Sequence, residues 1–180
     1  MEHEARTQEE EKVYGTLEAW GVPFTAYQHE PAYTMEQCAE FDRAHGFGAG
    51  TSHCKNLFLC NRQKTKFYLL VIDGDKPFRT ADISRQLGVS RLSFGPEEQL
   101  LAYLGCHPGA IGPMGLLWDG QNAVELLLDE DLKKAETLLV HPGVNTATIA
   151  LSSKDFFETC LPRTGHAPRF VTLPGAADGR

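Results

Sequence analysis

The chain has 180 residues, of which 42% are hydrophobic and 23% are charged, and its net charge is −7. This length suits one domain that buries about 70% of its unfolded surface, so we expect a single domain over residues 1–180 with flexible ends at about 1–6 and 174–180. The negative charge excludes a protein that holds DNA or RNA along a broad basic face, and it disfavours binding to a membrane surface. Any nucleic acid should therefore be bound through a small area of the protein surface.

The cysteines and the N-terminus bear on the compartment. Five cysteines form an odd set without repeated close spacing, which favours free thiols over a disulfide framework. The N-terminus lacks the basic and apolar regions of a secretory signal, and the apolar stretches are too short to cross a bilayer. We expect a cytoplasmic protein.

Caps and apolar periodicity predict helices and strands along the whole chain. Residues 7–20 predict a helix, because Thr7 and Glu10 have the spacing of a capping box and Gly21 can end it. The next expected elements are an edge strand at 23–28, a helix from Thr34 to about Ala44, a glycine-rich loop at 46–52, and a hairpin of strands 55–60 and 66–72.

The rest of the chain continues the mixture. In order, we expect a helix from Thr80 to Gly88, a helix begun by Pro96 with Leu100, Leu101 and Leu104 on its apolar face, a Gly/Pro-rich loop at 105–115, a strand at 123–128, a brief helix with Lys133 and Lys134, strands at 138–140 and 146–151, a helix at 152–160, and a last strand at 170–173. Because these elements interleave without a regular β–α–β period, the fold class is α/β in the mixed, α+β sense.

Lys55 and Asn56 follow the glycine-rich loop directly. One interpretation is a solvated lysine at the end of a strand. The other is a lysine at the mouth of a pocket, where it donates to a phosphate or carbonyl oxygen, with Asn56 offering both a donor and an acceptor.

The stretch 105–115 holds four glycines and two prolines. It is either a plain connecting loop or a loop whose N–H groups approach a ligand, as glycine permits. Such N–H groups can stabilise the oxyanion formed when an ester is attacked.

His141 begins a short polar segment that precedes the expected strand at 146–151. Pro142 pushes its backbone towards an extended conformation, and the pair Asn145-Thr146 comes four residues later. A histidine at a strand end usually has a structural role. With the amide–hydroxyl pair close by, a structural role and recognition of a ligand are equally well supported for His141.

Metal and thiol chemistry have weak support. Cys54 and Cys106 each neighbour a histidine, His53 and His107, but neither pair has the usual spacing of zinc ligands. A cysteine nucleophile is disfavoured, because adjacent residues rarely present side chains to each other. We expect no metal and no cofactor, and any hydrolysis should use water or the substrate's own groups.

Three motifs together resemble a known family. Lys55-Asn56-Leu57-Phe58-Leu59, the loop Gly109-x-x-x-Pro113 and His141-Pro142…Asn145-Thr146-Ala147-Thr148 resemble the YbaK-like, prolyl-tRNA-synthetase-associated editing domains, in particular the free-standing type that deacylates alanyl-tRNA(Pro). The resemblance covers residues 10–173. It implies a mixed, partly barrel-like sheet flanked by helices, and hydrolysis of the ester between a mischarged amino acid and the terminal adenosine of tRNA.

The resemblance also implies roles for residues. Catalysis would rest on Lys55, Gly112 and His141, and substrate binding on Asn56, Gly109, Ala110, Ile111, Pro113, Asn145 and Thr146. The partners would be the aminoacylated acceptor end of tRNA and prolyl-tRNA synthetase. Local phosphate contacts could come from Lys55, Arg62, Lys64, Lys66 and Arg79, for which surface solvation is the alternative.

One residue departs from the family pattern. Gly143 stands where a larger apolar residue, often leucine, is expected after His-Pro. A wider pocket wall would keep seryl-, cysteinyl- or threonyl-tRNA open as substrates. A non-catalytic module that binds tRNA or a synthetase is the alternative from another class.

Overall fold

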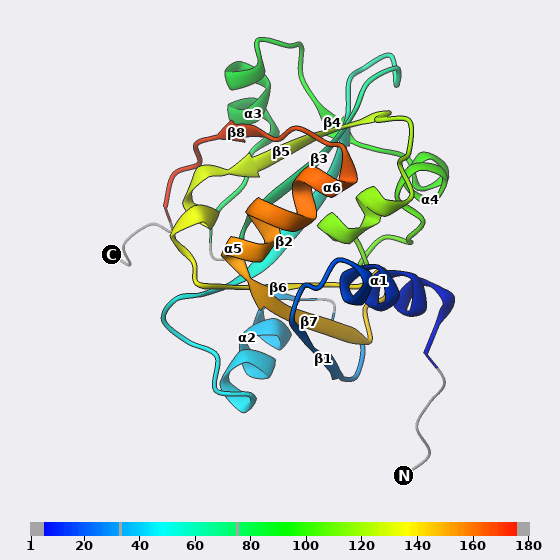
Figure 1. Ribbon diagram of the computed structural model, residues 1–180. Helices are drawn as coiled ribbons and strands as arrows, with labels where there is room; N and C mark the ends of the chain where they lie inside the picture. Colours follow the sequence, from blue (N-terminus) through cyan, green and yellow to red (C-terminus); the bar gives the residue numbers. More distant parts are fainter. Residues whose placement is uncertain (1–5, 33, 75, 176–180) are drawn as a thin grey trace.

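The structure is a computed structural model that describes residues 6–32, 34–74 and 76–175 (Figure 1). Its helical segments are α1 (Gln8–Ala19), α2 (Met35–Ala44), α3 (Thr80–Leu87), α4 (Glu97–Leu104), η1 (Pro113–Leu117), η2 (Glu130–Lys134), α5 (Ser153–Asp155), η3 (Phe156–Cys160) and α6 (Leu161–Thr164). Its strands are β1 (Phe24–Gln28), β2 (Thr51–Cys60), β3 (Phe67–Asp73), β4 (Ser93–Phe94), β5 (Val124–Asp129), β6 (Thr137–Val140), β7 (Ala147–Ser152) and β8 (Arg169–Val171). None of the helices in these ranges is long and apolar enough to cross a membrane.

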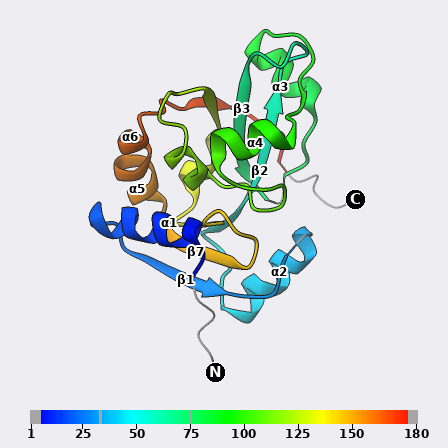
Figure 2. The ribbon, with the colours of Figure 1, turned by 90° about the vertical axis from the view of Figure 1, so that its right-hand side faces the viewer.

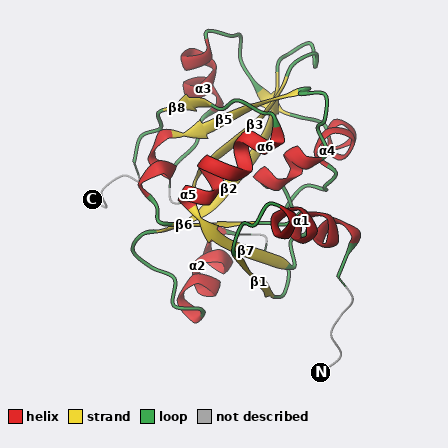
Figure 3. Ribbon diagram, in the orientation of Figure 1, coloured by secondary structure: helices red, strands yellow, loops and turns green. Residues whose placement is uncertain are grey.

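The strands form one mixed sheet in the order β1-β7-β6-β2-β3-β5-β8, with β4 paired to β2 (Figure 3). Strand β2 joins the two halves of this sheet. Its first residues, Thr51–His53, run parallel to β6, and the rest, Cys54–Cys60, run antiparallel to β3. Pairs β3–β5 and β5–β8 are parallel, whereas β1–β7 and β6–β7 are antiparallel. The prediction of a mixed sheet flanked by helices is confirmed.

Two apolar cores lie on opposite faces of the strands β3 and β5. Alternate residues of β3 face different sides, so Leu69 and Val71 belong to one core and Leu70 and Ile72 to the other. Helices α1, α4 and the run α5–η3–α6 cover the first face, and α3 covers the second (Figure 1). Both faces are buried, which explains why this part of the sequence lacks polar alternation.

Helix α2 covers a third surface, the outer face of β1 and β7, at the bottom of Figure 1. Its Phe41 packs edge-on against Tyr27 of β1, with 5.7 Å between ring centroids. Thr34 caps this helix through the predicted capping box, in which Gln37 is the partner. The α2 face of the sheet is where the polar side chains of the candidate site gather.

Several predicted boundaries need correction. Strand β2 begins at Thr51 and not at Lys55, because its start pairs with β6, a partner more than 80 residues away. Leu101 is 46% exposed and is not part of the apolar face of α4. The short strand β4 was not predicted. The helix expected at 152–160 continues through a π-helical turn to Thr164. The expected flexible ends fall largely outside the described residues.

Candidate functional site

Three histidines gather between the sheet and α2. His29 follows β1, His53 lies in β2, and His141 follows β6 directly. The ring centroid of His141 lies 6.5 Å from that of His29 and 6.4 Å from that of His53. Phe41 of α2 lies over the group, with its ring 5.1 Å from His29. Strand order brings these residues together, since β1, β7, β6 and β2 are neighbours in the sheet.

His141 is held as a neutral imidazole of defined tautomer. Its Nδ1 lies 2.9 Å from the carbonyl oxygen of Ala147, which can only accept, so Nδ1 carries the hydrogen and Nε2 remains an acceptor. Burial lowers the pKa of His141 below its ordinary value, and the nearby His53 and His29 lower it further, against the opposing effect of the Ala147 hydrogen bond. At neutral pH the side chain therefore offers a hydrogen-bond acceptor and no charge.

The other two histidines are fixed by their own partners. His29 Nδ1 donates to the carbonyl of Glu30 at 2.7 Å, and its Nε2 lies 2.8 Å from the Thr148 hydroxyl, with which it shares a hydrogen bond. His53 Nδ1 lies 2.9 Å from a carboxylate oxygen of Asp42, which belongs to α2. These contacts join α2 and β7 to the histidine cluster and set the orientation of the rings.

Lys55 lies on the same face of β2 as His53, because it follows two residues later in the strand. Its ammonium Nζ donates to the main-chain carbonyl of Lys76 at 2.7 Å. An ammonium has three donors, so two remain for a ligand while this bond persists.

Lys76 is itself buried and ion-paired. It is 6% exposed, and its Nζ lies 2.8 Å from Asp129 and also contacts Asp131 and the carbonyl of Leu173. Hydrogen bonds from Lys134 and Lys76 lower the pKa of Asp131 to about 2. The carbonyl that holds Lys55 thus belongs to a residue fixed by two carboxylates.

Asn56 does not lie beside Lys55. Adjacent residues of a strand face opposite sides, and Asn56 pairs with Val71, whose side chain belongs to the first core. Its Nδ2 donates to the carbonyl of Cys54 at 3.3 Å, and its Oδ1 is buried with no partner among the described residues. The side chains of Lys55 and Asn56 therefore lie on opposite faces of β2.

The Gly/Pro-rich loop reaches His141 through Gly112. A Cβ at position 112 would lie 2.7 Å from the carbonyl oxygen of His141, so only glycine fits without a shift of the backbone. Ala110 is buried, Ile111 packs against the core, and Pro113 begins η1. Gly109 has a φ of 89° at the loop's turn. The loop is anchored by its apolar side chains, and its backbone at Gly112 touches the candidate site.

Asn145 and Thr146 hold the segment that leads into α2. The carbonyl of Thr146 accepts from the N–H of His29 at 2.9 Å, and that of Asn145 accepts from the N–H of Ala32 at 3.4 Å. Both residues are therefore close to the histidine cluster, through their main chains.

Gly143 turns away from the cluster. Its φ is 96°, a conformation that favours glycine, and a Cβ there would lie 3.0 Å from Cβ of Glu9 in α1. The interpretation of Gly143 as part of a widened pocket wall is wrong, because this position faces α1.

Comparison with known proteins decides the family. The sequence model of one protein family, the aminoacyl-tRNA editing domain, matches residues 29–159 of this chain. This range includes the histidine cluster, Lys55 and the Gly112 loop. The chain belongs to the aminoacyl-tRNA editing domain family. The resemblance inferred from the three motifs is confirmed.

Two relatives and one solved structure show how far the likeness extends. The prolyl-tRNA editing protein ProX of Acetoanaerobium sticklandii is 32% identical over 161 residues, which cover 89% of this chain and 95% of that protein. The prolyl-tRNA synthetase associated domain-containing protein 1 of Bos taurus is 31% identical over 156 residues, covering 84% and 88%. A crystal structure described as that of a candidate trans-editing enzyme for prolyl-tRNA synthetase has a TM-score of 0.69 at 20% identity, covering 94% and 98%. This last likeness concerns the fold alone.

All five cysteines of this editing domain are buried. Cys54 and Cys106 are 6% and 2% exposed, and burial raises the pKa of each thiol to about 12. A thiol with such a pKa is a poor nucleophile at neutral pH. Across the described ranges, no group of three or more His, Cys, Asp or Glu side chains is arranged to hold a metal ion.

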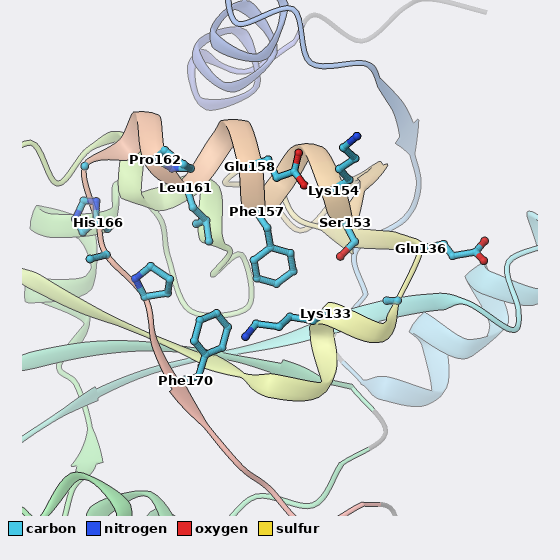
Figure 4. Close-up of a pocket in the computed structure, with 14 residues that line it drawn as sticks. Lys133, Glu136, Ser153, Lys154, Phe157, Glu158, Leu161, Pro162, His166 and Phe170 are labelled. Atoms are coloured by element: carbon cyan, nitrogen blue, oxygen red, sulfur yellow. The ribbon is translucent and has the colours of Figure 1, made fainter.

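Two cavities of different size are candidates for the editing site. A cavity of about 320 Å³ borders the histidine cluster and is lined by residues that include His29, Phe41 and Glu40. A larger one, of about 860 Å³, lies between α5–η3–α6 and β8 and is lined by Phe157, Phe170 and Lys133 among others (Figure 4). None of the predicted site residues lines the larger cavity, so its size does not make it the editing site.

Sequence reasoning missed His29 and the role of Lys76, and it gave Thr148 no role of its own. It treated His53 only as a possible zinc ligand beside Cys54. A usable signal was present, because His53-x-Lys55 places both side chains on one face of a strand. His29 and Lys76 gave no such signal, since only the tertiary structure brings them to the site.

Proposed function

We propose that this protein is a trans-editing aminoacyl-tRNA deacylase that hydrolyses the ester of a mischarged tRNA, namely alanyl-tRNA(Pro). The single observation that carries the proposal is the convergence, within an editing-domain fold, of neutral His141 and the Gly112 backbone beside the face that bears Lys55. The name of the ProX relative supports prolyl-tRNA as the tRNA concerned.

In the proposed reaction, the oxygen of a water molecule attacks the ester carbonyl carbon and the bond to the ribose oxygen breaks. The products are a free amino acid and tRNA with its terminal hydroxyl restored. The ribose 2′-OH of the substrate assists the water, which agrees with burial and a raised pKa at Cys54 and Cys106 that make both thiols poor nucleophiles.

Each protein group acts by position and charge. Lys55 places its free donors on the phosphate or ester oxygens of the terminal adenosine while Lys76 holds it in place. Gly112 and its loop neighbours Gly109, Ala110, Ile111 and Pro113 bring backbone groups to the carbonyl. His141 presents Nε2 as an acceptor to the α-ammonium of the amino acid.

The biological logic follows from pocket size. A synthetase site shaped for proline cannot strongly reject alanine, because a few methylenes are worth only about 1–3 kcal/mol. A second, smaller pocket can admit alanine and exclude proline. The proposed partners are the acceptor end of tRNA and prolyl-tRNA synthetase, and the proposed compartment is the cytoplasm. The roles of Asn56, Asn145 and Thr146 in substrate binding belong to this proposal.

A panel of charged tRNAs tests the specificity. Wild type is incubated with Ala-tRNA(Pro), Pro-tRNA(Pro), Ser-tRNA, Cys-tRNA and Thr-tRNA, and release of labelled amino acid is followed. Rapid release of alanine alone is the expected result. Release of serine, cysteine or threonine in its place would make this a deacylase of another specificity, and binding of tRNA without any release would make it a non-catalytic module.

A further inference from the structure

Basic residues are concentrated in one part of this acidic chain. Residues 61–95 hold seven Lys and Arg against three Asp, although the net charge of the chain is −7. This segment forms the β2–β3 turn, β3, α3 and β4. The turn and α3 lie at the same end of the sheet (Figure 2), and β4 lies at that end as well (Figure 1). The net charge of this segment is therefore positive, opposite in sign to that of the whole chain.

A groove of about 570 Å³ lies in this region, lined by Arg62, Thr80, Arg91, Leu92, Ser93 and Phe94. Within residues 6–32, 34–74 and 76–175, no carboxylate forms an ion pair with Arg62 or Arg91. By contrast, the nearby Arg79 and Arg85 both pair with Asp82. Two guanidinium groups thus line the groove with their hydrogen-bonding capacity unused.

An aromatic side chain stands open beside these arginines. Phe94 is 64% exposed, and its ring lies 6.5 Å from that of Phe78. Proteins that bind single-stranded nucleic acids combine an exposed aromatic ring with basic side chains, because phosphates pair with arginine and bases stack on the ring.

The groove is connected to the candidate editing site by a short segment. Lys76 holds Lys55 through its carbonyl, and Thr80 lines the groove four residues later. Four residues span at most about 14 Å. Phe94 of the same groove pairs with Leu59, four residues after Lys55 in β2, so a strand of a few nucleotides that leaves Lys55 can reach the groove.

We propose that this groove binds the single-stranded 3′ end of tRNA, with phosphates on Arg62 and Arg91 and a base stacked on Phe94. The identity of the RNA rests on the proposed function, whereas the chemistry of the groove does not. The groove explains how an acidic protein holds a polyanion: contact is limited to one basic patch beside the site.

The test measures binding by fluorescence anisotropy. The probe is a labelled RNA hairpin of the acceptor stem that carries no amino acid and ends in a single-stranded 3′ segment. The double variant Arg62→Ala/Arg91→Ala should bind about tenfold or more weakly, and the slope of log K against log salt should fall by about 1 to 2, as loss of two phosphate contacts requires. Lys154→Ala/Arg163→Ala removes two exposed charges of the helical run α5–α6 and should bind like wild type. Phe94→Ala should lose about tenfold, and Phe94→Tyr should restore binding.

The result that overturns the groove is wild-type affinity and salt slope in the arginine variant, or an equal loss in the Lys154/Arg163 control. Loss of binding to prolyl-tRNA synthetase with RNA binding intact would also overturn it, because the groove would then dock a protein. The proposed deacylase activity and the proposed RNA-binding groove can be refuted independently of each other. A wild-type protein that binds the hairpin through these residues but releases no amino acid refutes the deacylase alone, and active enzyme with unaffected arginine variants refutes the groove alone.

Discussion

The ammonium of Lys55 donates to the main-chain carbonyl of Lys76 at 2.7 Å, and Lys76 is anchored by the buried Asp129. The side chain of Lys55, which we expect to meet the substrate, is therefore oriented by a residue that is itself buried and ion-paired. The arrangement explains how a long, flexible lysine, which forms no ion pair with a carboxylate of the described residues, can present two donors at a defined point.

Removal of the Lys76 ammonium should be costly. Lys76→Met leaves the Asp129 carboxylate, which is fully buried, without its cation, and breaking such a pair costs about 3–5 kcal/mol of unfolding free energy. Urea unfolding measures the loss. Lys134→Met is the matched control, since Lys134 pairs with Asp131 at the surface, and it should cost less than about 1 kcal/mol. Equal effects of the two substitutions would refute the anchoring role.

Gly112→Ala should displace the carbonyl of His141. The added Cβ would lie 2.7 Å from that oxygen, so either the loop or His141 must move, at a cost of about 1–3 kcal/mol of stability and with a clear loss of deacylation. Gly120→Ala is the control, because position 120 has open space around it. Thermal melts and turnover of both variants decide the matter, and full activity of Gly112→Ala would mean that the loop is only a connector.

The buried His141 should make stability depend on pH. Its pKa is lowered in the folded state, so the unfolded chain binds this proton first as pH falls through about 6.5, and the unfolding free energy decreases with acidification in that window. His141→Gln removes this contribution. Its stability should therefore drop less than that of wild type between about pH 7.5 and about pH 5.5, as measured by urea unfolding. Parallel losses in the two proteins would contradict a lowered pKa.

Thiol reagents should leave the enzyme active. Cys54 and Cys106 are buried, with the pKa of each thiol raised to about 12, so neither is available as a thiolate under native conditions. Native protein treated with iodoacetamide should retain its rate of amino-acid release. Rapid inactivation, prevented by Cys106→Ala, would instead indicate a cysteine-dependent hydrolase.

Local signals in the sequence were sufficient for much of the fold. The capping boxes that begin α1 and α2, the left-handed Gly88 after α3, and the β2–β3 hairpin all depend on residues close together in the chain. Lys55, Gly112 and His141 could be selected as candidates because their neighbours are unusual for a plain strand or loop.

The assembly of the site could not be derived from such signals. The parallel pairing of β2 with β6 extends β2 back to Thr51 and brings His53 towards His141. Strand alternation sends Asn56 to the other face, and a positive φ turns Gly143 towards α1. The β2–β6 pairing and the approach of His53 to His141 depend on contacts between segments far apart in the sequence, for which periodicity carries no information.

The measurement that tests the central claim most directly is release of labelled alanine from Ala-tRNA(Pro) by wild type, Lys55→Ala and the exposed control Lys154→Ala. Wild type and the control should release alanine at similar rates, and Lys55→Ala should be slower by on the order of 100-fold, with the same thermal melt. Near-normal release by a natively folded Lys55→Ala protein would contradict the assignment of the editing site to this face of the sheet.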